Sequence, residues 1–221
     1  DPNQMINTTT ESISAGLMLL RTLPIEKLTL DLSTLHESSL SIILPQFALL
    51  KSLGLYFINN QSQMPLRDQD VVGLLACLRE IPNLSSLSLS FYNITQLLAV
   101  VNNVGEALKF LPGLAELKLK FGRLNCPDEH LINLCSGLEV LTSLKTLELE
   151  LDYVKQTTMK GINALTQVLK KMVRVQDLLL NLSANSFITS QGFSDICSSI
   201  KCLQDLTYLD LDLSFSLAFD S

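Results

Sequence analysis

The stretch Leu117-Lys118-Leu119-Lys120-Phe121 alternates apolar and polar residues, and this five-residue pattern recurs along the chain. Further copies begin at Leu28, Leu53, Leu87, Leu147, Leu178 and Leu209, with an average spacing of about 30 residues. Alternation with a period of two is typical of a β-strand with one buried face. The sequence therefore predicts seven short strands, each with leucines on one face and mainly polar residues on the other.

The apolar residues between these strands follow a helical period instead. They recur three and four positions apart within 70–78, 97–108, 131–141 and 162–169. Such short, one-sided helices gain their stability by packing on a neighbour. A strand, a helix and a parallel strand form a right-handed unit. We therefore expect an α/β fold: one right-handed βα solenoid over residues 1–221, with about seven parallel strands on its concave face and helices on its convex face.

On these residues the chain resembles the leucine-rich repeat family, and most closely its ribonuclease-inhibitor-like subgroup. The resemblance covers about residues 11–217 and implies a horseshoe or arc with the sheet inside. It is also similar to repeat arrays in large proteins of unicellular eukaryotes, some of which are attached to kinase domains. The asparagine that the family places after each strand is replaced here, so we expect no buried asparagine ladder. The replacing residues are Ser33, Ile58, Tyr92, Gly122, Asp152, Ser183 and Ser214.

The amino-acid composition argues against two classes of function, nucleic-acid binding and membrane insertion. The chain of 221 residues contains 49 leucines and carries a net charge of −6. An acidic chain without a basic patch argues against nucleic-acid binding, and no apolar run is long enough for membrane insertion. The chain begins at Asp1 without a methionine and ends soon after its last predicted strand. We expect it to be a fragment of a longer chain or a subunit of a larger complex.

The number of cysteines indicates the cellular compartment of the protein. Their number is odd and matches no disulfide framework, so we expect reduced, buried thiols and cytoplasmic residence. No signal-peptide pattern opens the chain, and five Asn-x-Ser/Thr triplets are interpreted as chance in a sequence rich in serine and threonine. The cysteines are Cys77, Cys126, Cys135, Cys197 and Cys202.

If the leucines point inward, the alternate residues line the concave face, which becomes acidic toward the C-terminus. Lys118 should lie beside Glu148 and Lys120 beside Glu150, which leaves the aspartates uncompensated. We hypothesise a docking surface for a basic segment of a protein partner; the alternative is a solvated acidic face with no partner. The candidate residues are Tyr56, Tyr92, Glu148, Glu150, Asp152, Asp177, Tyr208, Asp210 and Asp212.

One interval between strands is longer than the others. The step from Leu53 to Leu87 exceeds the average spacing by about four residues, and we place the insertion within 58–65. Insertions in solenoids map to rim loops that often bind partners, although added loop length is also tolerated without function. The candidate rim loop contains Asn59, Asn60, Gln61 and Ser62.

Signals for chemistry are weak. The chain has two histidines, and Cys126, His130 and Cys135 lack the paired spacing of a zinc site. Pro127-Asp128-Glu129 is instead typical of a helix start, and no glycine-rich phosphate loop occurs. We therefore expect no enzyme activity, no cofactor and no metal. The leading interpretation is a non-catalytic protein-interaction scaffold; the alternatives are a permanent structural subunit of a large assembly and a regulatory module of a larger enzyme such as a kinase.

Overall fold

The computed structural model describes residues 10–32, 40–58, 68–92, 94, 99–185, 188–215 and 217–218. Helices precede and separate the strands of one large sheet. In chain order the elements are α1 (Thr10–Leu20), β1 (Lys27–Asp31), α2 (Leu40–Ile43), η1 (Leu44–Gln46), β2 (Ser52–Ile58), α3 (Asp68–Ala76), η2 (Cys77–Glu80), β3 (Ser86–Tyr92), α4 (Val100–Leu108), β4 (Glu116–Lys120), α5 (Asp128–Glu139), β5 (Thr146–Glu150), α6 (Met159–Leu169), β6 (Asp177–Asn181), β7 (Ile188–Thr189), α7 (Ser190–Ile200), β8 (Tyr208–Asp212) and β9 (Leu217–Ala218).

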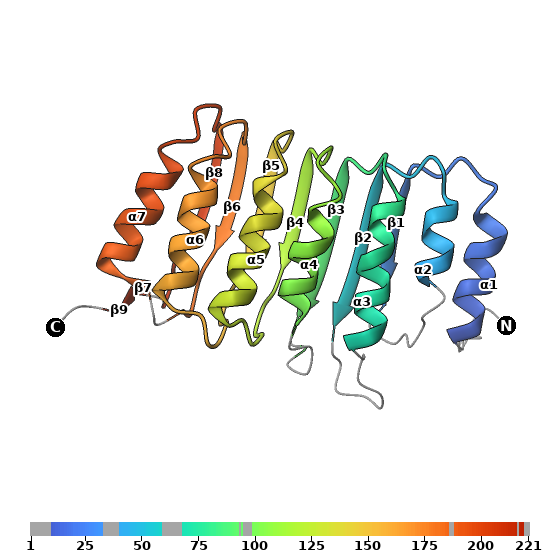
Figure 1. Cartoon of the computed structure of the whole chain (residues 1–221), viewed down its shortest axis with the longest axis horizontal. Coiled ribbons are helices and arrows are strands. Elements are labelled where there is room, and N and C mark those ends of the chain that lie inside the picture. The colour runs from blue at the N-terminus through green and yellow to red at the C-terminus, as the bar shows by residue number, and fades with distance from the viewer. Residues whose placement is uncertain are drawn as a thin grey trace, which may run out of the picture.

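The seven predicted strands are confirmed, and all are parallel. The sheet has the order β1-β2-β3-β4-β5-β6-β8, and β7 and β9 form a separate two-stranded pair. Equivalent leucines lie opposite each other at every junction, as Leu117 does with Leu147. The helices form a row on one side of the sheet (Figure 1). The protein is thus an α/β protein with a sheet of seven parallel strands and helices between them.

The core lies between this sheet and the row of helices. The leucines of β2 to β6 that face the helices are buried. The next residue on the same face, two positions after the second of these leucines, is buried as well. At β2, β3 and β4 that residue is phenylalanine: Phe57 stacks on Phe91 with ring centres 4.7 Å apart, and Phe91 lies 6.0 Å from Phe121. A continuous aromatic stack therefore joins three neighbouring strands.

The strands at the two ends of the sheet are less buried than the sequence predicts. Leu178 in β6 is fully buried, whereas Leu209, which lies opposite it in β8, is 45% exposed. Leu28 and Leu30 in β1 are half-buried. These leucines point inward as predicted, but within the described residues no further strand flanks β1 or β8 on its outer side.

A left-handed residue follows each of the last four strands of the sheet. Arg123, Tyr153, Ala184 and Phe215 have φ between 51° and 58°. The N–H of Arg123 donates to Asp152 O at 3.0 Å, and the N–H of Tyr153 donates to Ser183 O at 3.0 Å. The turn thereby continues the backbone hydrogen bonding beyond the strands, which is what offsets the cost of a left-handed non-glycine residue.

A buried asparagine occurs at a different position from the one used by the family's asparagine ladder. Asn185 lies two residues beyond the position that holds Ser183 and is 1% exposed. Its side chain accepts a hydrogen bond from Val154 N–H at 3.0 Å and donates to Leu151 O at 2.7 Å. It also donates to Leu182 O at 2.9 Å. Asn185 therefore satisfies backbone groups on its own and the preceding turn, which apolar residues cannot do.

Two contacts between neighbouring helices are especially close. A Cβ on Gly137 of α5 would collide with the carbonyl oxygen of Gly105 in α4, so the two helices meet backbone to backbone. Farther along, Asp128 begins α5 as predicted, but its carboxylate caps the next helix: it accepts from Thr158 N–H at 2.8 Å and Gly161 N–H at 2.9 Å. These contacts set the spacing of the row.

The predicted helices over 131–141 and 162–169 correspond to α5 and α6, and the one over 70–78 to α3 with η2. In the predicted stretch 97–108, α4 begins at Val100, and Leu97 and Leu98 lie outside the described residues. None of the described helices has the length and apolar character needed to cross a membrane.

Candidate functional site

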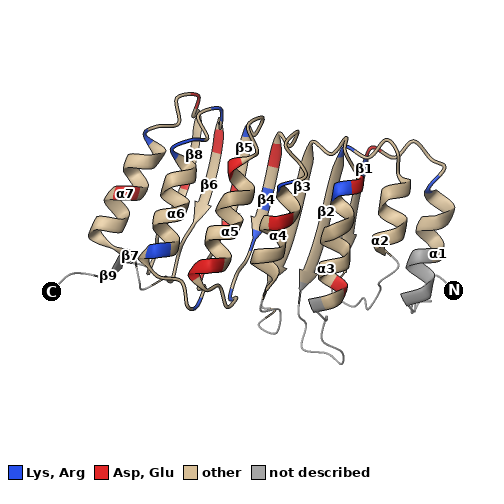
Figure 2. Ribbon diagram, viewed as in Figure 1, with Lys and Arg blue, Asp and Glu red and all other residues tan. Residues whose placement is uncertain are grey.

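The side of the sheet away from the helices carries the residues that alternate with the leucines. We call this side the open face; in the described residues it comprises positions such as Ser88, Lys118, Glu148, Leu179 and Asp210. Among the strands of the large sheet, β2 and β3 carry no charged residue, whereas β1 and the strands from β4 onward do (Figure 2). The open face is therefore where the sequence-predicted candidate residues are to be sought.

An ion-pair network joins β4 to β5 on this face, in the predicted register. Lys118 Nζ lies 3.2 Å from Glu148 Oε2, and Lys120 Nζ lies 2.7 Å from both Glu148 Oε1 and Glu150 Oε1. The expectation that Glu148 is exposed is wrong: the two lysine side chains cover it, and it is 8% exposed. The ammonium groups of the two β4 lysines thus neutralise the carboxylates of β5 on the open face.

The pKa values of the network agree with this geometry. Burial alone raises the pKa of Glu148, but hydrogen bonds and charge from Lys120 and Lys118 outweigh it, so the pKa lies below its usual value. Burial likewise opposes the charged form of Lys120, yet Glu148 and Glu150 hold its pKa above the usual value. Both partners stay ionised at neutral pH, and Glu148 contributes to the sheet rather than to a free acidic surface.

The acidic end of the open face lies on β6 and β8. Register places Asp177 opposite Tyr208, Leu179 opposite Asp210, and Asn181 opposite Asp212, and we call these six residues the acidic end. Asp177 Oδ2 accepts from Thr146 Oγ1 at 3.2 Å, and Asp212 Oδ1 accepts from Ser214 N–H at 2.8 Å.

No cation of the described residues forms an ion pair with the aspartates of the acidic end. The backbone hydrogen bond from Ser214 lowers the pKa of Asp212, and this carboxylate is therefore charged at neutral pH. Asp152, just beyond β5, is also without an ion pair there. Its carboxylate lies over Gly122, where an added Cβ would be 2.8 Å from Oδ1. Within the part of the chain that the structure describes, Asp152, Asp177, Asp210 and Asp212 thus have no ion-pair partner.

The three candidate tyrosines lie at separate places. Tyr56 is half-buried against Gly54, and its hydroxyl is 3.4 Å from Ser88 Oγ. Tyr92 is 39% exposed and lies beside Asp152 over Gly122, with the Arg123 guanidinium 6.0 Å from its ring centre. Tyr208, 52% exposed, belongs to the acidic end. Only Tyr208 is placed with the uncompensated carboxylates of β6 and β8.

The candidate rim loop of Asn59, Asn60, Gln61 and Ser62 lies outside the described residues. Its proposed role therefore stays a prediction.

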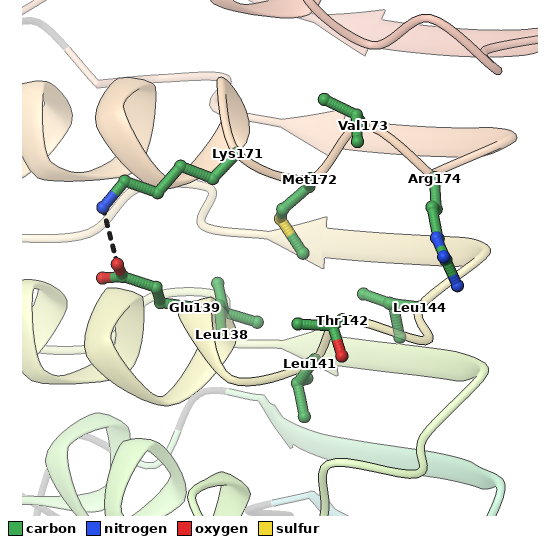
Figure 3. A pocket seen from close by; sticks show the side chains of 9 residues that line it. All are labelled: Leu138, Glu139, Leu141, Thr142, Leu144, Lys171, Met172, Val173 and Arg174. Atoms are coloured by element: carbon green, nitrogen blue, oxygen red, sulfur yellow. Dashed lines mark hydrogen bonds and ion pairs between the residues drawn. The ribbon is translucent and has the colours of Figure 1, made fainter.

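Two concave sites occur elsewhere, and sequence reasoning missed both. A cavity of about 240 Å³ lies between the turns that follow α5 and α6; Leu138, Leu141 and Met172 line it (Figure 3). Lys171 Nζ pairs with Glu139 Oε1 at 2.6 Å on its helix side. A groove of about 150 Å³ lies between α3 and α4. No residue pattern in the sequence indicates these hollows.

The cysteines and histidines form no metal-binding group among the described residues. Burial raises the pKa of Cys126 and of Cys135 to about 12, so both thiols are protonated at neutral pH. Cys77 behaves in the same way. The expectation of five buried thiols is wrong for Cys197 and Cys202, which are exposed on and just after α7 because they lie on its solvent side.

Comparison with known proteins gives no family. No family model matches the chain, and no curated protein matches it. Among solved structures, the chain is similar to the crystal structure of a Bacteroides fragilis protein, with 14% identity over 95% of this chain and 73% of that one. The TM-score is 0.47.

Proposed function

We propose that the chain is a non-catalytic protein-binding scaffold of the leucine-rich repeat type, built as a right-handed βα solenoid with the open face as its concave side. Six successive parallel junctions in one register support this, as does the spacing of about 30 residues between strands. So does the left-handed turn that recurs after the last four strands. A stack of this kind presents a large preformed surface.

The partner we propose is a protein with a basic segment that docks on the acidic end. The observation that carries this proposal is the set of three aspartates, Asp177, Asp210 and Asp212, beside the exposed ring of Tyr208. Uncompensated carboxylates attract a basic segment over a distance and suppress acidic competitors. An exposed tyrosine is a typical interface anchor and can also receive a cation on its ring.

A comparative pull-down from the native source tests this function. The chain and its D210K/D212K variant are immobilised at equal density, and bound proteins are identified by mass spectrometry. Proteins that bind the chain and are lost from the variant, and that contain basic segments, are the expected result. Equal recovery on both surfaces would contradict docking at the acidic end.

A second candidate function is that of a permanent subunit in a larger assembly. The exposed apolar side chains at the ends of the sheet favour it: Leu209 at one end, and Leu19 of α1, 81% exposed, at the other. Exposed apolar surface of this kind marks interaction sites or aggregation-prone edges. Size-exclusion chromatography with light scattering separates the two functions, since a stable monomer at high concentration argues against obligate assembly.

We also propose cytoplasmic residence. All five cysteines are free thiols, which is typical of a reducing compartment. Glycans found at Asn60 or Asn93 by mass spectrometry of the native protein would refute this location.

A further inference from the structure

The cavity between the turns that follow α5 and α6 lies within the row of helices. Described helices and strands flank both turns on each side (Figure 1), so the cavity does not depend on where the chain begins or ends. Its floor is apolar, since Leu138 and Leu141 are 1% and 3% exposed and Met172 is 8% exposed. Val173, 41% exposed, adds an apolar side chain that a ligand can reach from solvent.

Arg174 places a positive charge in this cavity. It stands four residues before the first leucine of its strand, a position that holds an uncharged or acidic residue before the other six strands of the large sheet. These residues are Pro24, Leu49, Asn83, Gly113, Ser143 and Asp205. The Arg174 side chain is exposed, and no carboxylate in the described part of the chain forms an ion pair with it. An unpaired guanidinium beside apolar side chains favours an anion that also carries an apolar group.

The second cation of the cavity is already neutralised. Lys171 Nζ lies 2.6 Å from Glu139 Oε1. Figure 3 shows that Lys171 extends along the helices to Glu139, whereas Arg174 extends toward Leu144 on the neighbouring turn, with Met172 between the two cations. The cavity therefore has a closed ion pair at one end, the guanidinium at the other end and an apolar floor between them.

The size and charge of the cavity limit the ligand. Its volume of about 240 Å³ exceeds the roughly 150 Å³ of a cavity that holds one benzene and falls short of the roughly 300 Å³ at which pockets for drug-sized ligands begin. A branched aliphatic group of about five carbons with one polar head fits this range. The planar fork of a single guanidinium matches a carboxylate, whereas a doubly charged phosphate lacks a second unpaired cation and meets the charge of Glu139.

We propose that this cavity is a binding site for a small aliphatic carboxylate. The guanidinium of Arg174 donates two hydrogen bonds to the carboxylate, and the aliphatic group lies over Leu141 and Met172. A free organic acid and the C-terminal residue of a peptide both present this chemistry. The site lies apart from the acidic end, so its test is independent of the proposed scaffold function.

The test follows backbone amide signals of the full, nitrogen-15-labelled chain by NMR during titration with 4-methylpentanoate. We expect saturable shifts confined to residues 138–144 and 171–175. The neutral 4-methylpentanamide lacks the charge and acetate lacks the aliphatic chain, so each should bind at least about tenfold more weakly. Equal binding of the amide, or shifts spread over the surface without saturation, would overturn the proposal.

Three variants test the role of Arg174. Arg174→Gln should weaken binding of 4-methylpentanoate by about tenfold or more, and Arg174→Lys should restore only part of the affinity, because an ammonium lacks the planar fork. Arg79→Gln is the matched control: it removes the same charge from an exposed arginine that does not line this cavity, and it should change binding less than about twofold. Equal losses for Arg174→Gln and Arg79→Gln would reduce the effect to net charge and overturn the proposal.

A peptide arm separates the two sources of the carboxylate. A four-residue peptide that ends in leucine is titrated with a free and with an amidated C-terminus. If the free peptide binds through the same signals more tightly than 4-methylpentanoate, and amidation abolishes binding, the ligand is a peptide C-terminus. If 4-methylpentanoate binds and neither peptide does, the ligand is a free acid. If none of the carboxylates shifts residues 138–144 and 171–175, the cavity is not a carboxylate site.

Discussion

The backbone contact between α4 and α5 makes Gly137→Ala a sharp test of how the helices are spaced. The new Cβ would collide with the carbonyl oxygen of Gly105 and lie 3.1 Å from its Cα. Since the obstacle is backbone rather than the end of a flexible side chain, no rotamer change relieves the clash. The helices must separate, and the leucines beneath them, such as Leu134 and Leu138, must repack.

Two opposing effects set the magnitude. Overpacking a well-packed contact costs about 1–3 kcal/mol and more when backbone must move. Replacing a mid-helix glycine by alanine recovers up to about 1 kcal/mol of helix propensity. We therefore expect Gly137→Ala to lower the free energy of unfolding by about 2 kcal/mol, which corresponds to a fall in Tm of about 4–8 °C for a chain of this size.

Gly73 in α3 supplies the matched control, because nothing lies within 4 Å of a Cβ built there. Gly73→Ala should be neutral or raise the stability by up to about 1 kcal/mol. Both variants are compared with the wild type by urea unfolding followed by circular dichroism. If Gly137→Ala proves as stable as Gly73→Ala, the backbone contact between α4 and α5 does not exist and the spacing of the row is set elsewhere.

Three further predictions concern polar contacts. Asp128→Ala should cost about 1–2 kcal/mol in urea unfolding at pH 7, because Thr158 N–H and Gly161 N–H at the start of α6 lose their acceptor. Burial alone would raise the pKa of Asp128, but hydrogen bonds from Thr158 and Gly161 lower it, so the wild type should lose this advantage only as the pH falls through that lowered pKa. Asn185→Leu should cost about 3 kcal/mol by the same assay, since it leaves buried backbone groups unpaired. Lys120→Met should raise the pKa of Glu148, measured by NMR titration, because the carboxylate loses one of its two lysine partners. An unchanged pKa would mean that Lys118 alone neutralises Glu148.

The strands and their register could be predicted because one residue type marks them. Leucine at every second position fixes which face is buried, and matching of the leucines between copies aligns the strands across the sheet. The pairing of Lys118 with Glu148 follows from that alignment alone. The burial of Glu148 does not follow from the alignment, because it depends on two long lysine side chains that reach over the carboxylate from the neighbouring strand.

Contacts between one strand–helix pair and the next could not be predicted from the sequence for a similar reason. Asp128 was interpreted as an acid that favours the N-terminus of its own helix, and the sequence contains no local mark that it reaches the next one. The left-handed turns gave no signal because Arg123, Tyr153 and Phe215 hold positions where glycine or asparagine would be recognised. The role of Asn185 could not be predicted because the equivalent residues in the preceding turns, Leu124 and Val154, are apolar.

The distribution of charge explains why binding should concentrate at one end of the open face. Each strand junction brings equivalent positions within reach of one another, so an acidic strand is neutral when its neighbour is basic, as β5 is beside β4. β6 and β8 are neighbours that both carry aspartate, and neither neutralises the other. A basic group from a partner would reduce the repulsion between them, as we propose for the acidic end. We therefore expect the acidic end to favour a basic partner over an acidic one.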